Sequence, residues 1–377
     1  MKSFAKRLAA LLACGALAVG MSACSNSSDN SAALLALAAG GQPQPQAASG
    51  AYAKIGTQTI NGVEYDLVTF GLWPQTIKAG NVTVNDSVTK TAGAFTYCKG
   101  SDGQWYVKVK ESACPPVCKY SDGTTAKESS ADSWKWFKVE PIKWRVLTTN
   151  YNGTGKKLLF AESVLANGVY YDYQSVNRTI GGKTIHPNNY EHSRVRAFLN
   201  GLSYQRKANA GGEQSACDDF LGKGFLQTAF TADELAIIAD TSVDNGERST
   251  FPNANAKQWN NGKNPYASDT ATVDKVFLLS LQEVTTGAYG FDEDYNAAGV
   301  GNARIRAATD YARASGANQN GTEGLGGWWW QRSPLYDYDY SARYADSNGE
   351  SFFSAIVSEV NEGVGFGDIV PALCVGN

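Results

Sequence analysis

The most distinctive segment of the sequence is Gly327-Trp-Trp-Trp-Gln-Arg-Ser-Pro334. Bulky aromatic residues favour strands and usually lie inside a protein, so we expect a core strand here, with one of the three rings facing outward. A sugar-stacking platform is the alternative interpretation of three adjacent indoles. Arg332 would pair with a carboxylate and thereby fix the start of the segment that follows.

Tyrosine alternates with aspartate directly after this strand. The residues are Tyr336, Asp337, Tyr338, Asp339, Tyr340, Tyr344 and Asp346. Because carboxylates are rarely buried without a partner, we expect an exposed loop. Tyrosine offers a large amphipathic contact area with few rotatable bonds, as in antibody paratopes, which favours a binding surface over a plain solvated connection. Further residues could join the same surface, although each Phe is also a core candidate: Phe352, Phe353, Phe366 and Asp368.

The first half of the sequence is typical of a sheet protein. Asn61-Gly62, between apolar residues, predicts a tight hairpin because both turn positions need a positive φ. Alternating apolar and polar residues, as around Trp144 and Val146, indicate strands with one buried face. The predicted strands are residues 66–71, 104–110, 134–139, 142–147 and 157–162.

The middle of the chain is predicted to be helical. The apolar spacing from Val195 to Leu202 predicts one helix, which Gly201 would end. Capping boxes begin at Thr231 and at Ser280, the second directly after a predicted strand over residues 276–279. An alanine-rich helix is expected over residues 304–313, followed by short strands separated by exposed loops. The predicted fold class is therefore α+β.

The N-terminus resembles an export signal, with basic residues before an apolar run, residues 8–19, that is too short to span a bilayer. Met21-Ser-Ala-Cys24 resembles a bacterial lipobox, so we expect residues 1–23 to be a signal peptide and Cys24 to be lipidated. The polar residues 24–51 would be a flexible tether and residues 52–377 a single domain at the outer membrane surface. Ordinary secretory cleavage near Ala23 is the alternative.

Charge and cysteine content limit the function further. The chain has 33 basic and 36 acidic residues, and cleavage of the signal would remove three of the bases. A mildly acidic body argues against nucleic-acid binding. No other stretch is long and apolar enough to span a bilayer, so the membrane would be contacted only through the lipid anchor. Among Cys98, Cys114 and Cys118 one disulfide is expected, of undetermined pairing, while Cys217 stands alone and Cys374 lies in an apolar stretch typical of the core.

The sequence does not favour catalysis. His186 and His192 are the only histidines, and neither belongs to a recognisable triad or metal motif. Asp337 and Asp339 lack an apolar neighbour that would raise the pKa of one of them. We therefore expect neither an active site nor a cofactor. The sequence shows no recognisable calcium-binding loop.

Several segments together resemble a family of spirochaete lipoproteins that includes a Treponema variable protein of a diversity-generating retroelement. They are Phe137-Lys-Val-Glu-Pro-Ile-Lys-Trp-Arg-Val-Leu147, Asn189-Tyr-Glu-His-Ser-Arg-Val-Arg-Ala-Phe-Leu-Asn200, Lys275-Val-Phe-Leu-Leu-Ser280, the tryptophan segment and the closing Val370-Pro-Ala-Leu373. Family members usually have Leu in place of Gln331, and many have Arg in place of Val370.

The resemblance implies a C-type-lectin-like fold of the formylglycine-generating-enzyme subtype with a variable region at about residues 328–377. Reverse transcription would rewrite adenines there, and residues 335–348 and 351–354 contain only residue types reachable from AAC or AAT codons. Enzymes of this subtype use a cysteine pair that Cys374 alone does not reproduce. The expected function is display of interchangeable side chains to a protein or other surface ligand. A fixed adhesin or structural envelope lipoprotein, and a divergent enzyme, are the alternatives.

Overall fold

The computed structural model describes most of the chain after the N-terminal segment. The described residues are 50–111, 119–125, 133–207, 214–254, 260–268, 270–317, 326–358 and 367–376. The predicted signal peptide, the lipidation site Cys24 and nearly all of the tether lie outside them, as do Cys114, Cys118 and Phe366.

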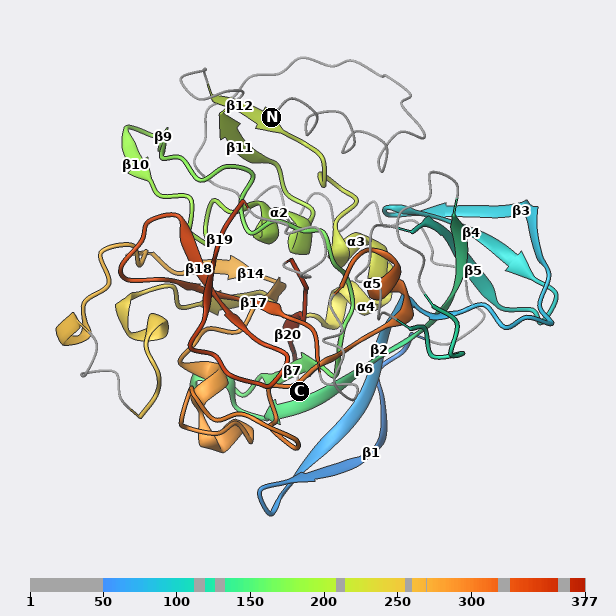
Figure 1. Cartoon of the computed structure of the whole chain (residues 1–377), viewed down its shortest axis with the longest axis horizontal. Coiled ribbons are helices and arrows are strands. Elements are labelled where there is room, and N and C mark those ends of the chain that lie inside the picture. Colours follow the sequence, from blue (N-terminus) through green and yellow to red (C-terminus); the bar gives the residue numbers. More distant parts are fainter. Residues whose placement is uncertain are drawn as a thin grey trace.

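A nine-stranded antiparallel sheet forms the frame of the molecule (Figure 1). Seven strands follow the order β15-β20-β7-β6-β5-β4-β3, β2 also pairs with β6, and β1 pairs with β2. Its strands are β1 (Ala53–Ile60), β2 (Val63–Ile77), β3 (Val84–Ala92), β4 (Phe95–Gly100), β5 (Trp105–Lys110), β6 (Trp134–Thr148), β7 (Lys157–Ala161), β15 (Val276–Phe277) and β20 (Ala372–Val375). The last strand of the chain therefore lies inside the sheet, between β7 and β15.

The predicted strands of the first half overlap observed strands, and the predicted hairpin is confirmed. Asn61 and Gly62 connect β1 to β2 with φ values of 51° and 79°. The two strands predicted around Pro141 are one long strand, β6. The alternation there is incomplete, because Arg145 is buried like its neighbours Trp144 and Val146 and forms an ion pair with Glu162 at 2.9 Å.

The helices are short and lie in the middle of the sequence. They are α2 (Arg194–Asn200), α3 (Phe225–Ala229), α4 (Ala232–Ile237) and α5 (Asp310–Ala314), with 3-10 turns η1 (Tyr151–Gly153), η2 (Glu247–Thr250), η3 (Asn260–Gly262), η4 (Glu283–Thr285) and η5 (Gly287–Tyr289). Gly201 ends α2 in the left-handed region, and the capping box of Thr231 with Glu234 begins α4, as predicted. None of the helices in the described part of the chain combines the length and hydropathy that a membrane span requires.

Two helix predictions need correction. The capping contacts between Ser280 and Glu283 are present, but they begin a single 3-10 turn, which ends where Thr286 adopts an extended backbone conformation. The helix predicted over residues 304–313 is wrong in its first half. Arg304 and Arg306 are buried in irregular backbone, where their guanidinium groups bind main-chain carbonyls, and only α5 is helical.

Small sheets complete a strand-rich α+β fold. A three-stranded antiparallel sheet consists of β17 (Trp329–Pro334), β18 (Ser341–Ala345) and β19 (Ser354–Ile356), in the order β17-β18-β19. Figure 1 shows it on the side of the molecule away from β3, β4 and β5. The other paired strands are β8 (Ser163–Val164), β9 (Arg178–Ile180), β10 (Lys183–Ile185), β11 (Tyr204–Lys207), β12 (Gln214–Cys217), β13 (Thr241–Val243), β14 (Thr272–Asp274) and β16 (Ala307–Ala308). One large apolar core contacts both the frame and the three-stranded sheet.

Candidate functional site

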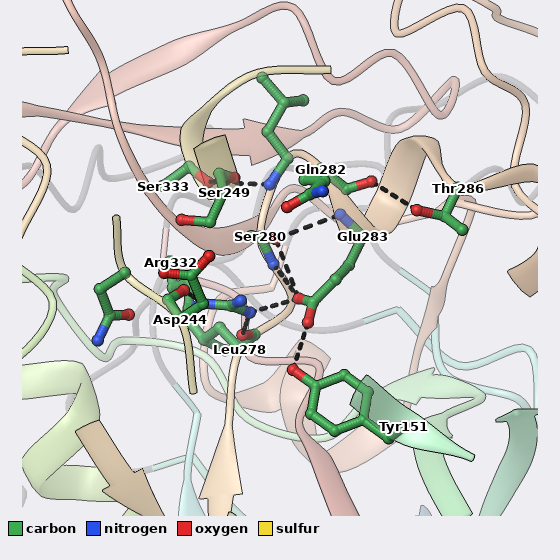
Figure 2. A network of polar contacts seen from close by, with 12 residues as sticks. Tyr151, Asp244, Ser249, Leu278, Ser280, Gln282, Glu283, Thr286, Arg332 and Ser333 are labelled. Carbon is green, nitrogen blue, oxygen red and sulfur yellow. Dashed lines mark hydrogen bonds and ion pairs between the residues drawn. The ribbon is translucent and has the colours of Figure 1, made fainter. Parts of the chain in front are cut away.

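A buried ion pair fixes the strand that leads to the tyrosine-rich segment (Figure 2). The Arg332 guanidinium on β17 binds the Glu283 carboxylate, which confirms the predicted arginine–carboxylate pair, and it also donates to the carbonyl of Leu278 at 2.8 Å. Glu283 accepts three further hydrogen bonds, from the Tyr151 hydroxyl at 2.6 Å, the Ser280 amide at 2.7 Å and the Ser280 hydroxyl at 3.1 Å. Burial alone would raise the pKa of Glu283, but these partners, Arg332 foremost, hold it below the usual range.

The backbone around Arg332 is fixed as well. Its amide donates to the carbonyl of Leu279 at 3.0 Å, and its carbonyl accepts from the Tyr171 hydroxyl at 2.8 Å. The next residue, Ser333, donates to the Ser249 carbonyl at 3.1 Å and accepts from the Leu281 amide at 2.9 Å. The chain therefore reaches Pro334 in a position that three distant segments fix, around residues 171, 249 and 279–281.

The tryptophans form the core side of this strand. Trp329 and Trp330 are fully buried, and their indole N–H groups donate to the carbonyls of Arg304 at 3.0 Å and Val169 at 3.3 Å. Trp328 is only half-buried. The prediction of a core strand is confirmed for Trp329 and Trp330, whereas Trp328 packs against the core and stacks on Tyr344 instead of facing outward.

Past Pro334 the chain leaves the core in a loop between β17 and β18. Asp337 and Tyr338 are exposed, Tyr338 by 52%, while Tyr336, Asp339 and Tyr340 are half-buried. The Tyr338 and Tyr340 rings lie 5.5 Å apart between centroids. These side chains are therefore accessible on a short, tightly anchored turn.

Asn188, which the sequence analysis missed, holds this loop. Its side-chain amide donates to the carbonyls of Tyr338 at 2.9 Å and Ser341 at 3.0 Å, and its backbone amide donates to the Asp339 carbonyl at 3.2 Å. Asn188 is fully buried, and nothing in its local sequence indicates a partner 150 residues away. Nearby, the His186 imidazole lies 3.5 Å from the Asp339 carboxylate.

The loop between β18 and β19 carries the second exposed aromatic pair. Phe352 and Phe353 are 50% and 39% exposed. Their rings continue a series of contacts: Trp328 stacks on Tyr344 at 5.6 Å, Tyr344 on Phe353 at 5.9 Å, and Phe352 on Tyr295 at 5.9 Å. We call residues 335–340 and 346–353 the two aromatic loops.

Three residues predicted for the surface are buried. Tyr344 is 7% exposed because it lies between Trp328 and Phe353. Asp346 is 6% exposed, and its carboxylate accepts the backbone amides of Asn348 at 2.9 Å and Glu350 at 2.8 Å.

The third of these residues, Asp368, is fully buried. It accepts hydrogen bonds from the Trp328 amide at 3.0 Å and the Asn167 side chain at 2.6 Å, and burial raises its pKa well above the usual range. Asp346 and Asp368 thus act inside the molecule, where backbone N–H groups replace water. The prediction that these three residues belong to an exposed surface is wrong.

Arg343, also missed, joins the two aromatic loops from inside. It is buried on β18 and donates to the Phe352 carbonyl. Burial lowers its pKa to about 10, and the nearby Tyr336, Tyr295 and Asp337 oppose this shift. Both loops thus converge on one cation.

The part of the chain that contains both aromatic loops matches a known protein family. Residues 154–376 match a family described as "Domain of unknown function (DUF6273)". The chain belongs to the DUF6273 family. No curated protein and no solved structure gives a significant match. The DUF6273 region begins after β6, so it contains the anchoring ion pair, both aromatic loops and the closing strand β20.

A side-chain contact within the DUF6273 region explains the polar residue at position 331. Gln331 is fully buried on β17, and its amide donates to the Ser351 hydroxyl at 2.9 Å. This bond connects the strand before one aromatic loop to the Ser351 side chain, directly before Phe352 in the other. Gln331 therefore supports the second loop from the interior.

The cysteines of the described residues are free thiols. Cys98, Cys217 and Cys374 are buried and unbridged, so a disulfide that includes Cys98 is not formed, while Cys114 and Cys118 lie outside the described residues. Cys374 is completely inaccessible on β20, as predicted for a core residue, and burial raises its pKa to about 12. Within the described ranges no three His, Cys, Asp or Glu side chains converge as a metal site.

Proposed function

We propose that this DUF6273 protein is a lipid-anchored ligand-binding protein of the bacterial surface, whose two aromatic loops form the binding surface. The observation that carries the proposal is the exposure of Tyr338, Phe352 and Phe353 on loops that extend from the buried strands β17 and β18. Exposed aromatic rings on a rigid frame lose little conformational entropy on binding. Catalysis has no part in the proposal.

The proposed fold subtype is the C-type-lectin-like fold of formylglycine-generating enzymes. Its support is the resemblance of the tryptophan segment and the closing Pro-Ala-Leu, together with a terminal strand that pairs inside the main sheet. In such a frame the closing strand holds the end of the segment while Arg332 holds its start. The loops between them could change their side chains without changing the frame.

We further propose that a retroelement diversifies the exposed part of this segment. The positions free to vary are those with exposed or half-buried side chains, residues 336–340, 348 and 352–354. Residues 341–347 are all buried, so their substitutions would have to preserve packing. A true variable repertoire would therefore show its widest chemical range in the two aromatic loops.

Binding is tested with a double variant and a control matched for exposure. Peptides selected from a random display library on the full chain serve as probes. Tyr338→Ala/Phe352→Ala should abolish their binding, whereas Trp134→Ala/Tyr173→Ala, which removes two similarly exposed rings on other strands and loops, should retain it. Equal binding by both variants would refute the proposed surface.

Diversification is tested on the neighbouring DNA. A near-copy of the last segment with AAC or AAT codons, beside a reverse transcriptase gene, supports the variable protein. Their absence, with binding intact, favours a fixed adhesin of the same fold. Loss of binding specificity on exchanging residues 335–353 between sequence variants would separate a diversified receptor from a structural envelope protein.

A further inference from the structure

A third loop, residues 291–303, lies against the second aromatic loop and is bonded to it. The Ser351 amide donates to the Tyr295 carbonyl at 2.8 Å, and the Gly299 amide donates to the Asn348 carbonyl at 3.0 Å. The Tyr295 ring stacks on Phe352. Backbone and side chain therefore continue the aromatic surface into a part of the chain that precedes the tryptophan segment.

Arg304 stabilises this contact from the interior of the protein. Its guanidinium is fully buried and donates to the carbonyls of Asp292 at 2.7 Å, Asp294 at 2.9 Å and Ala297 at 3.0 Å. The same group also binds the carbonyl of Gly349, in the second aromatic loop. Because one guanidinium satisfies carbonyls from both loops, the two loops are positioned as a unit.

The side chains around this unit are acidic. Residues 291–303 contain no Lys or Arg, and the only two in residues 328–358, Arg332 and Arg343, are buried. Carboxylates that are exposed or half-buried on the three loops are Asp292, Glu293, Asp294, Asp337, Asp339 and Glu350. A polar hollow lined by Asn61, Asp292 and residues 297–303 adjoins them.

We propose that residues 291–303 form a constant part of the binding surface and that the surface takes a protein partner presenting lysine or arginine side chains. The inference rests on the proposed function. Exposed rings with negatively charged faces and a rim of carboxylates both attract organic cations, the first by cation–π contact and the second by charge. Side-chain changes in the aromatic loops would tune this preference, while the third loop would keep it.

The test measures binding of oligolysine, with oligoglutamate as the opposite-charge probe, to the full chain at low and at physiological ionic strength. The loop variant is Asp292→Asn/Glu293→Gln/Asp294→Asn. The amides of Asn keep the side-chain oxygens that accept the Asp294 and Asn296 amides, so the loop conformation is preserved. The control removes the same charge from exposed positions elsewhere, with Asp86→Asn/Asp218→Asn/Asp233→Asn.

The loop variant should bind oligolysine roughly tenfold more weakly than the control. Each exposed carboxylate–lysine pair contributes little by itself, so the effect comes from the three lost pairs together. Tyr338→Ala/Phe352→Ala should also weaken oligolysine binding, because it removes the cation–π contacts. Non-specific attraction to an acidic protein would not depend on these rings. Equal weakening by the loop variant and the control, or no binding by the unmodified chain, would overturn the inference. If Tyr338→Ala/Phe352→Ala no longer binds the library-selected peptides but the loop variant still does, the proposed function is supported and the role of residues 291–303 is refuted.

Discussion

The turn of residues 336–340 and the segment 341–346 that follows it, which contains strand β18, have the same kinds of side chain in opposite surroundings. The turn presents Tyr338 and Asp337 to solvent, whereas Tyr344 and Asp346, a few residues on, are buried. The difference lies in the neighbours. β18 is paired along both edges, by β17 and β19, and the turn is paired along neither.

This contrast teaches that tyrosine and aspartate are not by themselves marks of a binding loop. Tyr344 serves as a core residue because two rings cover its faces, and Asp346 serves as an internal cap because backbone amides surround its carboxylate. Exposure is a property of the fold around the residue. Substitutions of buried and of exposed side chains in this segment should therefore differ in their effect on stability.

The largest loss of stability is expected for Arg332, whose buried ion pair fixes the strand before the turn. Arg332→Met should lower the free energy of unfolding by about 3–5 kcal/mol, because it leaves the Glu283 carboxylate buried without its cation. Urea unfolding of the full chain gives the measurement. Arg332→Met/Glu283→Gln removes both charges and should recover part of the loss; no recovery would show that the charge pair is not the cause.

Two tyrosine variants probe the division directly. Tyr344→Ala should cost about 3–4 kcal/mol because it opens a hole between Trp328 and Phe353. Tyr338→Ala, on the exposed turn, should change the free energy of unfolding by less than about 0.5 kcal/mol. Thermal or urea unfolding separates them, and similar losses would erase the distinction between turn and strand.

The aspartates should differ in the same way but by less. Asp346→Ala removes the acceptor of two backbone amides and should cost about 2 kcal/mol. Asp337→Ala should be nearly neutral. If Asp337→Ala were the more destabilising variant in urea unfolding, the exposed turn would have a structural role that its burial does not indicate.

The last effect is a dependence of stability on pH, which the buried carboxyl of Asp368 should show. Burial raises the pKa of Asp368, so above about pH 4, the usual value of an unfolded aspartate, the folded state binds more protons than the unfolded state. Stability attributable to Asp368 therefore falls as pH rises from that value toward the folded pKa, by at most about 1.4 kcal/mol per pH unit. Asp368→Asn should remove this slope.

Asp339→Asn is the matched control for the pH experiment, because Asp339 lies on the partly accessible turn. The stability difference between Asp368→Asn and the unmodified chain should change more steeply with pH than the difference for Asp339→Asn. Urea unfolding at a series of pH values measures both. A flat difference for Asp368→Asn would mean that the carboxyl is ionised in the fold.

Local sequence predicted the local structures well. Asn61-Gly62 adopts its turn because few other residues tolerate that backbone, and Thr231 begins α4 because its side chain and that of Glu234 cap each other's amides. The core role of Trp329 and Trp330 followed from their size. The helix expected from Arg304 failed because carbonyls far along the chain bind that arginine.

What the sequence determined by itself is therefore the set of hairpins, caps and apolar strands, together with a tyrosine-rich segment after a buried strand, since each depends on residues within a few positions. Which tyrosines and carboxylates reach the surface was decided only by the tertiary structure. Asn188, Arg304 and Glu283 act on the segment across large sequence separations, and no local pattern encodes such partners. Burial is determined by what packs against a residue, and that is known only when the chain has folded.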